Sequence, residues 1–198
     1  MENVFEKMAQ RYDTPERIAL AQIISREIAR LLPNSQEKTM IDYGGGTGLV
    51  SLPLAKDVKS LLLVDAAGAM LQLAQHKIDT NALSHVSLMQ ADFTQEVPAI
   101  KADIIMLSLV LLHIPETKQI LQTLFELLNE QGVLVLVDFN TNQQAVHPKI
   151  HSGFEQAQLA QLLKQIGFTR VESQTFHQGE RLFMNQDASL FSIKAQKG

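Results

Sequence analysis

The most constraining feature of this chain is a glycine-rich segment, GGGTG at residues 44–48, which follows a β-rich run from Thr39 to Tyr43. Glycines lack a Cβ, so the main chain can turn sharply there and lie against a ligand or another backbone. The residues that follow can form a helix, and a helix start presents free N–H groups at the positive end of its dipole. The segment therefore predicts a cradle for an anion or a nucleotide.

The spacing around the glycines narrows the choice of nucleotide. A phosphate-binding P-loop carries Lys and then Ser or Thr after its last glycine, but Leu49 and Val50 follow Gly48. A dinucleotide fingerprint that began at Gly44 would need its third glycine at Leu49. The pattern is instead D-x-G-x-G-x-G, beginning at Asp42. A carboxylate there would repel a pyrophosphate and suits a ligand that carries an ammonium or another positive group.

The run IDYGGGTG resembles the first motif of class I S-adenosylmethionine-dependent methyltransferases, and the later motifs of that family follow in order. Leu61 to Val64 is a second hydrophobic run that leads into DAAGAML, Val86 to Gln90 leads into ADF, and ADIIMLSLVLLHI resembles the family's fourth strand and its loop. The resemblance covers residues 39–139 closely and the remainder loosely. It implies an α/β fold, a Rossmann-like three-layer sandwich with a seven-stranded, mainly parallel sheet whose last strand is antiparallel.

The resemblance also implies the cofactor, S-adenosylmethionine, and the residues that would bind it. Asp65 would accept hydrogen bonds from both ribose hydroxyls, and Asp92 would bind the adenine amino group. Ala67 stands where family members often carry Ser, which removes one polar contact. The implied cofactor-binding residues are Asp42, Gly44, Gly46, Gly48, Asp65, Ala66, Met70, Asp92, Phe93 and Ser108.

Several of these residues have a purely structural alternative. Asp42 could accept hydrogen bonds from the N–H groups of the glycine segment, and Asp65 could cap the helix that follows it. Phe93 could be an ordinary core residue. The placement of the three acids argues against a chance match to the family. Asp42, Asp65 and Asp92 stand at the ends of successive predicted strands, and α/β sheets bind ligands at the carboxyl ends of their strands.

Hydrophobic periodicity predicts the order of the remaining elements. Thr14 and Pro15 begin a helix that Pro33 stops, and a second helix runs from Leu49 to Lys56 with a kink at Pro53. Further strands are expected at 104–107, 133–137, 169–176 and 189–195, and a last helix ends before Gly167. We expect a single domain over residues 1–198, with an N-terminal helical lid at 1–38 and a Rossmann-like core at 39–198.

Composition excludes several classes of protein. The chain has 198 residues, which suits one domain, and it has no cysteine, which excludes disulfide scaffolds and thiolate-bound zinc. No metal site is expected. The net charge of −4, with basic residues dispersed among acids, disfavours a nucleic-acid partner. We expect a cytoplasmic protein without a signal peptide or a membrane span, whose oligomeric state the sequence leaves open.

The expected reaction is methyl transfer to a small molecule. The N-terminal FEKMAQRYD is similar to the opening of ubiquinone and menaquinone biosynthesis methyltransferases, with Tyr12 in the place of their lid tyrosine. Tyr12 and the aperiodic stretch His147 to Phe154, within a connection that could also be an ordinary surface loop, would cover the pocket. The candidate catalytic bases are His113, Tyr12 and His151, although His113 could simply lead into a helix that Pro115 starts. The alternatives are a non-catalytic domain that binds S-adenosylmethionine and a nicotinamide-dependent oxidoreductase.

Overall fold

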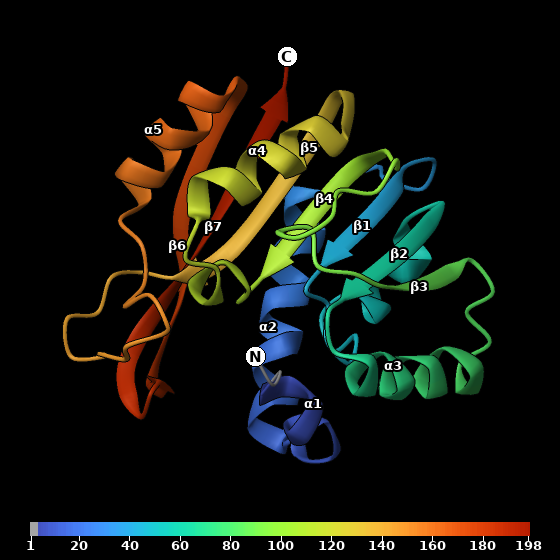
Figure 1. The fold of residues 1–198 in the computed structure, drawn as a ribbon, viewed down its shortest axis with the longest axis horizontal. Helices are drawn as coiled ribbons and strands as arrows, with labels where there is room; N and C mark the ends of the chain where they lie inside the picture. The colour runs from blue at the N-terminus through green and yellow to red at the C-terminus, as the bar shows by residue number, and fades with distance from the viewer. Residues whose placement is uncertain (1–3) are drawn as a thin grey trace. The chain divides into compact units, whose positions relative to one another are not determined.

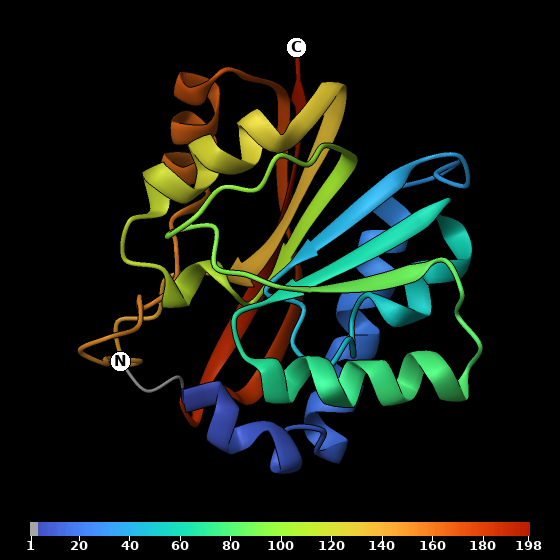
Figure 2. The same ribbon diagram turned by 45° about the vertical axis from the view of Figure 1, so that its right-hand side comes forward.

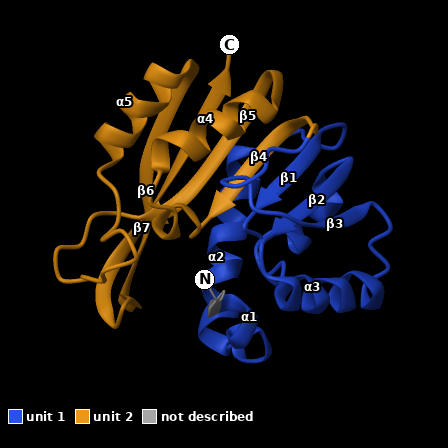
Figure 3. Cartoon of the chain, in the orientation of Figure 1, with its two compact units in different colours: residues 1–98 blue, residues 99–198 orange. Residues whose placement is uncertain are grey.

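The computed structural model describes residues 4–198, so the first three residues of the predicted lid lie outside the described part of the chain. The chain divides into two compact units, residues 1–98 and residues 99–198 (Figure 3). The first unit carries the glycine segment. Helices and strands alternate along much of residues 4–198, as the hydrophobic pattern predicts, but the strands at 86–90 and 102–108, and those at 168–183 and 186–197, follow each other without a helix between them (Figure 1).

The first unit contains a three-stranded parallel sheet. Its strands are β1 (Thr39–Tyr43), β2 (Ser60–Asp65) and β3 (Val86–Gln90), with Asp42 opposite Leu63 and Asp65 opposite Gln90. Helix α3 (Gly68–Thr80) packs against β2 and β3, and Figure 2 shows it lying along one face of this sheet. Because the strands are parallel, their carboxyl ends share one edge. The glycine segment and Asp65 lie at that edge.

The N-terminal part of the first unit is helical. It consists of α1 (Val4–Met8), the 3₁₀ turn η1 (Ala9–Arg11) and α2 (Pro15–Leu31). The Thr14 hydroxyl caps α2 by accepting a hydrogen bond from Arg17 N at 3.3 Å. Pro15 occupies the first helical turn, which confirms the predicted start of this helix, and Ile28 is buried.

One expected helix of the first unit is wrong. The sequence predicts a helix from Leu49 to Lys56, but residues 49–51 form turns and only Leu52–Asp57 is helical, as the 3₁₀ segment η2. Pro53 occupies the first turn of η2, where its missing N–H leaves no hydrogen bond unmade. The proline therefore starts a short helix where a kink in a longer one was expected.

The second unit contains the remaining four strands. These are β4 (Ala102–Ser108), β5 (Leu128–Phe139), β6 (Phe168–Phe183) and β7 (Gln186–Lys197); β5 runs parallel to β4, and β7 runs antiparallel to both β5 and β6. The turn η3 (Leu111–His113) and the helices α4 (Thr117–Leu127) and α5 (Gln156–Ile166) complete the unit. Gly167 ends α5 with a φ of +124°, which a glycine adopts readily, so the predicted helix stop is confirmed.

The strand order of the sheet is β3-β2-β1-β4-β5-β7-β6. The predicted fold class is therefore confirmed, with seven strands of which only the last along the chain runs antiparallel to the rest. The near-continuous apolar runs of β4 and β5 are buried, as expected for strands covered on both faces. Strands β5, β6 and β7 are longer than predicted because their outer parts alternate or are polar, and so lack a continuous apolar signal.

Candidate cofactor site and acceptor region

The glycine segment leaves open space beside Gly46. Gly44, Gly46 and Gly48 have φ values of +74°, +56° and +77°, a region that side chains with a Cβ rarely occupy. A Cβ added to Gly48 would lie 2.6 Å from the Leu52 side chain, so this glycine is required by packing. A Cβ added to Gly46 would meet no atom within 4 Å. Gly46 thus combines a conformation that favours glycine with free space of the kind a ligand needs.

Asp42 is a buried carboxylate without a full set of partners. It is 2% exposed, and its Oδ2 atom accepts no hydrogen bond among the described residues. Burial raises its pKa to about 7; the Ser51 hydroxyl lowers it in part, although its geometry falls short of a full hydrogen bond, and the charge of Asp65 raises it further. Within residues 4–198, the glycine segment donates no hydrogen bond to Asp42 Oδ2, as the structural alternative would require. An unpartnered oxygen at this position fits a ligand that carries a positive group.

Asp65 connects the glycine segment to the start of α3. Its Oδ2 accepts a hydrogen bond from Gly46 N and its Oδ1 accepts one from Ala67 N, both at 2.8 Å. Burial raises the pKa of Asp65, and these two hydrogen bonds partly offset that rise. Two carboxylate oxygens have about four acceptor positions, so acceptor capacity remains for the hydroxyls of a ribose. The hydrogen bond from Ala67 N lies one residue before the first residue of α3, so Asp65 does not cap that helix.

Asp92 and Phe93 follow β3 and differ in what they can contact. Asp92 Oδ1 accepts hydrogen bonds from Thr94 N at 2.9 Å and from Thr94 Oγ1 at 2.6 Å. Phe93 is 2% exposed, and its ring stacks on Tyr43 with a centroid separation of 4.7 Å. The Tyr43 hydroxyl donates to Asp92 Oδ1 at 3.4 Å. The alternative of Phe93 as a core residue is thus supported, and Tyr43 is a residue of this site that the sequence reasoning missed.

The N-terminal helices pack directly on the residues implied for adenosine binding. Met70 is 1% exposed and forms an apolar cluster with Ala9 and Ala67. The partly buried rings of Phe5 and Tyr12 pack against this cluster. Helix α1 therefore lies beside the first turn of α3 (Figure 2). This placement agrees with the lid role expected for Tyr12.

An acid on α1 replaces a local cap for α3. Helix α3 has no capping side chain of its own at Ala67. Glu6 accepts hydrogen bonds from Gly68 N at 2.5 Å and from Ala69 N at 3.1 Å, which satisfies two free N–H groups at the positive end of the helix dipole. The position of α1 is therefore coupled to the helix that begins just after Asp65.

A second anchor joins the N-terminal segment to the glycine segment. Lys77 forms an ion pair with Asp13 at 2.6 Å and donates a hydrogen bond to the Thr47 carbonyl at 2.7 Å. The Thr47 hydroxyl donates to Asp13 Oδ1 at 2.6 Å. The three residues are separated by 30 or more positions, and no sequence pattern links them. Sequence reasoning therefore missed both this anchor and that of Glu6.

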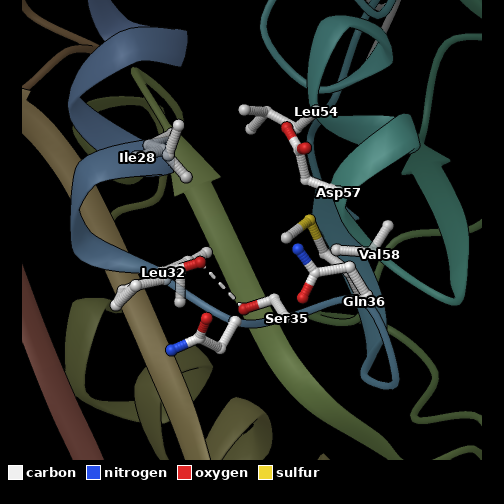
Figure 4. A pocket seen from close by; sticks show the side chains of 11 residues that line it. Ile28, Leu32, Ser35, Gln36, Leu54, Asp57 and Val58 are labelled. Atoms are coloured by element: carbon white, nitrogen blue, oxygen red, sulfur yellow. Dashed lines mark hydrogen bonds between the residues drawn. The ribbon is translucent and has the colours of Figure 1, made fainter.

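The first unit also contains a small hollow away from the glycine segment. It has a volume of about 210 Å³ at the amino end of β1, between α2 and η2, and Figure 4 shows the side chains of Ile28, Leu54 and Val58 around it. The Ser35 hydroxyl at its edge donates to the Leu32 carbonyl at 3.0 Å. Because the glycine segment follows the carboxyl end of β1, this hollow lies at the opposite end of the strand.

The second unit holds Ser108 and His113. Ser108 is the last residue of β4 and is half-buried. His113 is the last residue of η3. Partial desolvation of its ring lowers its pKa below 6.5, and the charge of His147 lowers it further. Its side chain is nevertheless exposed, so we expect this shift to be small. A neutral imidazole at pH 7 can accept a proton, which keeps His113 as a candidate base.

The other two candidate bases are less suited to that role. Burial raises the pKa of Tyr12 above 10, and the Arg17 guanidinium, 4.3 Å from the ring centroid, offsets this only in part. Tyr12 therefore keeps its proton near pH 7. His151 Nε2 donates to the Ile114 carbonyl at 3.0 Å, which places its proton on that nitrogen and ties residues 140–154 to η3. Only Nδ1 of His151 could accept a proton.

Asp138 was also missed by the sequence reasoning. It is 0% exposed, its Oδ2 accepts from Leu112 N at 3.1 Å, and its Oδ1 accepts from Phe139 N at 2.8 Å. Burial raises its pKa to about 7. This side chain holds η3, and with it His113, against the end of β5. An acid at the end of a buried strand was the only signal that could have identified it.

The described part of the chain contains neither a metal-binding cluster nor a helix that could span a membrane. Residues 4–198 bring together no group of three or more His, Cys, Asp or Glu side chains that could hold a metal ion. None of the helices within these residues combines the length and the apolar character needed to cross a bilayer.

Comparison with known proteins identifies the family. The sequence model of a methyltransferase domain family matches residues 34–187. This chain belongs to that family. The predicted class, an S-adenosylmethionine-dependent methyltransferase, and the predicted cofactor are therefore confirmed. The residues present fit the cofactor, because the glycine segment leaves space beside Gly46 and the buried Asp42 Oδ2 lacks a partner.

Individual relatives agree with this assignment. The chain is 26% identical over 145 residues to the tRNA 5-carboxymethoxyuridine methyltransferase of Escherichia coli, which covers 70% of this chain and 54% of that protein. The chain thus spans about half the length of the curated relatives it matches most fully. Among solved structures, a SAM-dependent methyltransferase from Aquifex aeolicus has a TM-score of 0.73 at 16% identity, covering 98% of each chain. Haemonchus contortus phosphoethanolamine N-methyltransferase 2, solved with S-adenosylhomocysteine, has a TM-score of 0.75 at 12% identity, covering 98% of this chain and 60% of that one.

Proposed function

We propose that this protein transfers a methyl group from S-adenosylmethionine to a small-molecule acceptor. One observation carries the proposal. At the shared carboxyl edge of β1, β2 and β3, Asp65 accepts hydrogen bonds from Gly46 N and Ala67 N, beside the open space at Gly46 and the unpartnered Asp42. This edge thus offers carboxylate acceptors, together with a glycine backbone that a ligand can approach closely. A nucleoside that carries a positive sulfonium and an ammonium group requires both.

Each residue of this edge has a separate proposed role. Asp65 would hold the ribose hydroxyls, and Asp92 would bind the adenine amino group. Asp42 would stabilise the positive charge of the methionine part from beneath the glycine segment. Main-chain groups at Gly44, Gly46 and Gly48, together with Ala66, Met70, Phe93 and Ser108, would complete the contact. Bound S-adenosylmethionine supplies a methyl group that is already activated, so the protein needs mainly to orient the acceptor and exclude water.

The N-terminal segment would act as the cover that excludes water. Tyr12 packs beside Met70, and the segment is anchored at Glu6 and at Asp13. If the acceptor must lose a proton, His113 is the best suited of the three candidate bases, because its imidazole is neutral near pH 7 and can accept that proton. Tyr12 would then serve as a hydrogen-bond donor in the cover and His151 as a structural tie.

Charge supports a small-molecule acceptor. The net charge is −4, and Arg30, Lys77 and Lys197 each form an ion pair with an acid, which reduces the positive surface available to phosphates. The second candidate is an RNA acceptor, which is favoured by the similarity to a tRNA methyltransferase. RNA binding would need a cluster of free basic side chains, and the dispersed charge of this chain does not supply one.

The test has two steps. Calorimetry with S-adenosylhomocysteine should show binding, and NADH should show none, which also tests the oxidoreductase alternative. Transfer of a radiolabelled methyl group should then label the small-molecule fraction of a cell extract and leave the RNA fraction unlabelled. Labelled RNA would establish the second candidate, while binding without any transfer would point to a non-catalytic domain.

Two further expectations belong to this proposal. The family match over residues 34–187 spans both compact units, which supports one methyltransferase domain. The contacts of α1 with α3 support residues 1–38 as its lid. A cytoplasmic location stays a prediction, and cell fractionation with an antibody to the protein would test it.

A further inference from the structure

The glycine segment does not fix its own conformation. It contains four glycines and one threonine. Glycine adopts both signs of φ and loses more conformational freedom on folding than any other residue, so contacts from outside the segment must hold it in one shape. Gly46 N donates to Asp65, and Gly48 lies against the Leu52 side chain. The residue between these two glycines, Thr47, has contacts of its own with two charged side chains.

Thr47 is held at both of its oxygen atoms. Its carbonyl accepts a hydrogen bond from Lys77 Nζ at 2.7 Å, and its hydroxyl accepts a second one from the same nitrogen at 3.1 Å. The hydroxyl donates in turn to Asp13 Oδ1 at 2.6 Å. Thr47 is 1% exposed, so water hardly competes for these bonds, and a hydrogen bond from an ammonium is stronger than one between neutral groups. Lys77 therefore fixes the orientation of the peptide that joins Thr47 to Gly48.

Lys77 and Asp13 neutralise each other beside the glycine segment. Lys77 Nζ lies 2.6 Å from Asp13 Oδ2, and the two side chains are 27% and 28% exposed. Solvent and salt therefore screen this pair less than a fully exposed one. Because the two charges cancel, the contact adds little field at an edge that is proposed to bind the positive groups of S-adenosylmethionine.

A role in stability alone would leave the placement of these contacts unexplained. Ion pairs near the surface contribute little to stability. This pair is directed at one peptide, next to Gly46 and Gly48 with φ values of +56° and +77°. A rotation of the Thr47–Gly48 peptide would alter the φ of Gly48 and the shape of the segment beside Gly46, where an added Cβ meets no atom within 4 Å. The contacts thus act on the open space proposed for the cofactor.

We infer that Lys77 is a positioning residue of the cofactor site: together with Asp13 it holds the Thr47 peptide, and so the glycine segment, in the shape that accepts S-adenosylmethionine. Lys77 acts through Thr47 and does not touch the cofactor. The inference rests on the proposed function, because that function places the cofactor against the glycine segment. Without Lys77, cofactor binding must itself order the segment, which lowers the affinity.

The test compares single and double variants by calorimetry with S-adenosylhomocysteine, at a temperature well below each melting point. Lys77→Met keeps the apolar stem and removes the ammonium, and it should weaken binding about tenfold, as expected if one backbone residue is left unordered. Thr47→Val keeps the shape and the carbonyl, and it should weaken binding about threefold. The double variant should bind about as weakly as Lys77→Met alone, because both residues act through one contact.

Hydrogen exchange gives a measurement that does not depend on affinity. In the cofactor-free protein, residues 44–48 should exchange faster in Lys77→Met than in the parent protein. Saturating S-adenosylhomocysteine should remove this difference, because the bound ligand then holds the segment.

Lys59→Met is the matched control. It makes the same change of side chain and charge at an exposed position just before β2. Since β1 and β2 are parallel, this position lies at the amino end of the strands and the glycine segment at the other. The control should keep the parent affinity and the parent exchange at residues 44–48.

Other outcomes overturn the inference in distinguishable ways. Parent affinity in both Lys77→Met and Thr47→Val would refute it, even with a lower melting temperature, and would leave the proposed function standing. Additive losses in the double variant would show that Lys77 does not act through Thr47, and an equal loss in Lys59→Met would assign the effect to lost charge; either result refutes the inference as well. A parent protein that binds no S-adenosylhomocysteine would refute the proposed function and the inference with it.

Discussion

Asp65 and Gly46 are joined by a hydrogen bond of 2.8 Å from the glycine N–H to Oδ2 of the carboxylate, across 19 positions of sequence. The other carboxylate oxygen accepts from Ala67 N at the start of α3. One side chain therefore sets the shape of the glycine segment and the position of α3. Any change at Asp65 should affect both stability and cofactor binding, and the two effects can be measured separately.

We expect Asp65→Ala to weaken S-adenosylhomocysteine binding about 10- to 100-fold, because hydrogen bonds to a charged acceptor contribute roughly 1.5 to 3 kcal/mol. The variant should also melt at a lower temperature, since two main-chain donors lose their partner. Asp65→Asn is the matched control, because it keeps the shape and one acceptor oxygen. Calorimetry that finds parent affinity in Asp65→Ala would refute the ribose role.

Gly46→Val should abolish S-adenosylhomocysteine binding. The added side chain meets no protein atom within 4 Å at its Cβ, so it enters the open space proposed for the cofactor, and a φ of +56° also disfavours a branched residue. The control is Gly167→Ala, at a position with a φ of +124° where the added Cβ would lie 3.0 Å from the Phe125 ring. This variant should have a lower melting temperature and unchanged binding. A Gly46→Val protein that melts lower yet binds normally would show that the space is not the cofactor's.

Asp13→Asn should loosen the N-terminal cover, because it weakens the 2.6 Å ion pair with Lys77 at the glycine segment. In hydrogen exchange, residues 4–14 should exchange faster in the variant, and S-adenosylhomocysteine should protect them in the parent protein. The stretch 147–154 should also become protected if it contributes to the cover. Asp79→Asn, an exposed acid on the same helix as Lys77, is the control and should exchange like the parent. A parent protein in which the ligand protects only the glycine segment would remove Tyr12 from the site.

The sequence was sufficient for features that depend on local pattern. The D-x-G-x-G-x-G segment, the apolar runs of the strands, the Thr14 cap and the Gly167 stop each involve residues close together in the chain, so periodicity and turn chemistry can identify them. Together they were enough to predict the order of most elements and the position of the glycine segment and Asp65 at one end of the sheet.

The contacts that complete the site could not be predicted because their partners are far apart in the chain. Glu6 with Gly68, and Asp13 with Lys77, are polar pairs that only the folded chain brings together. The Tyr43–Phe93 stack is of the same kind. The 3₁₀ segment η2 was predicted as a longer helix because a proline inside an apolar pattern can either kink a helix or start one. The tertiary structure decides between these outcomes.

The buried carboxyls of Asp42 and Asp138 lead us to predict an unusual dependence of stability on pH. Asp42 and Asp138 both have a pKa of about 7 in the folded protein, raised by burial from an ordinary value near 3.8. Between about pH 4 and pH 7 the folded state therefore binds more protons than the unfolded state at these two positions. Their contribution is fully present at low pH, and the free energy of unfolding falls as pH rises through this window, by on the order of a few kcal/mol per group.

Asp138→Asn tests this dependence in the second unit. The amide cannot ionise, so urea unfolding at a series of pH values from 4 to 8 should give a shallower fall in stability than in the parent protein. The variant should also be less stable than the parent near pH 5, because the amide N–H₂ leaves either Leu112 N or Phe139 N without an acceptor. The two proteins should converge toward pH 8, where the parent bears the cost of a buried charge. Glu172→Gln, at the surface of β6, should keep the parent slope, and an equal slope in Asp138→Asn would show that Asp138 is ionised in the folded protein throughout this range.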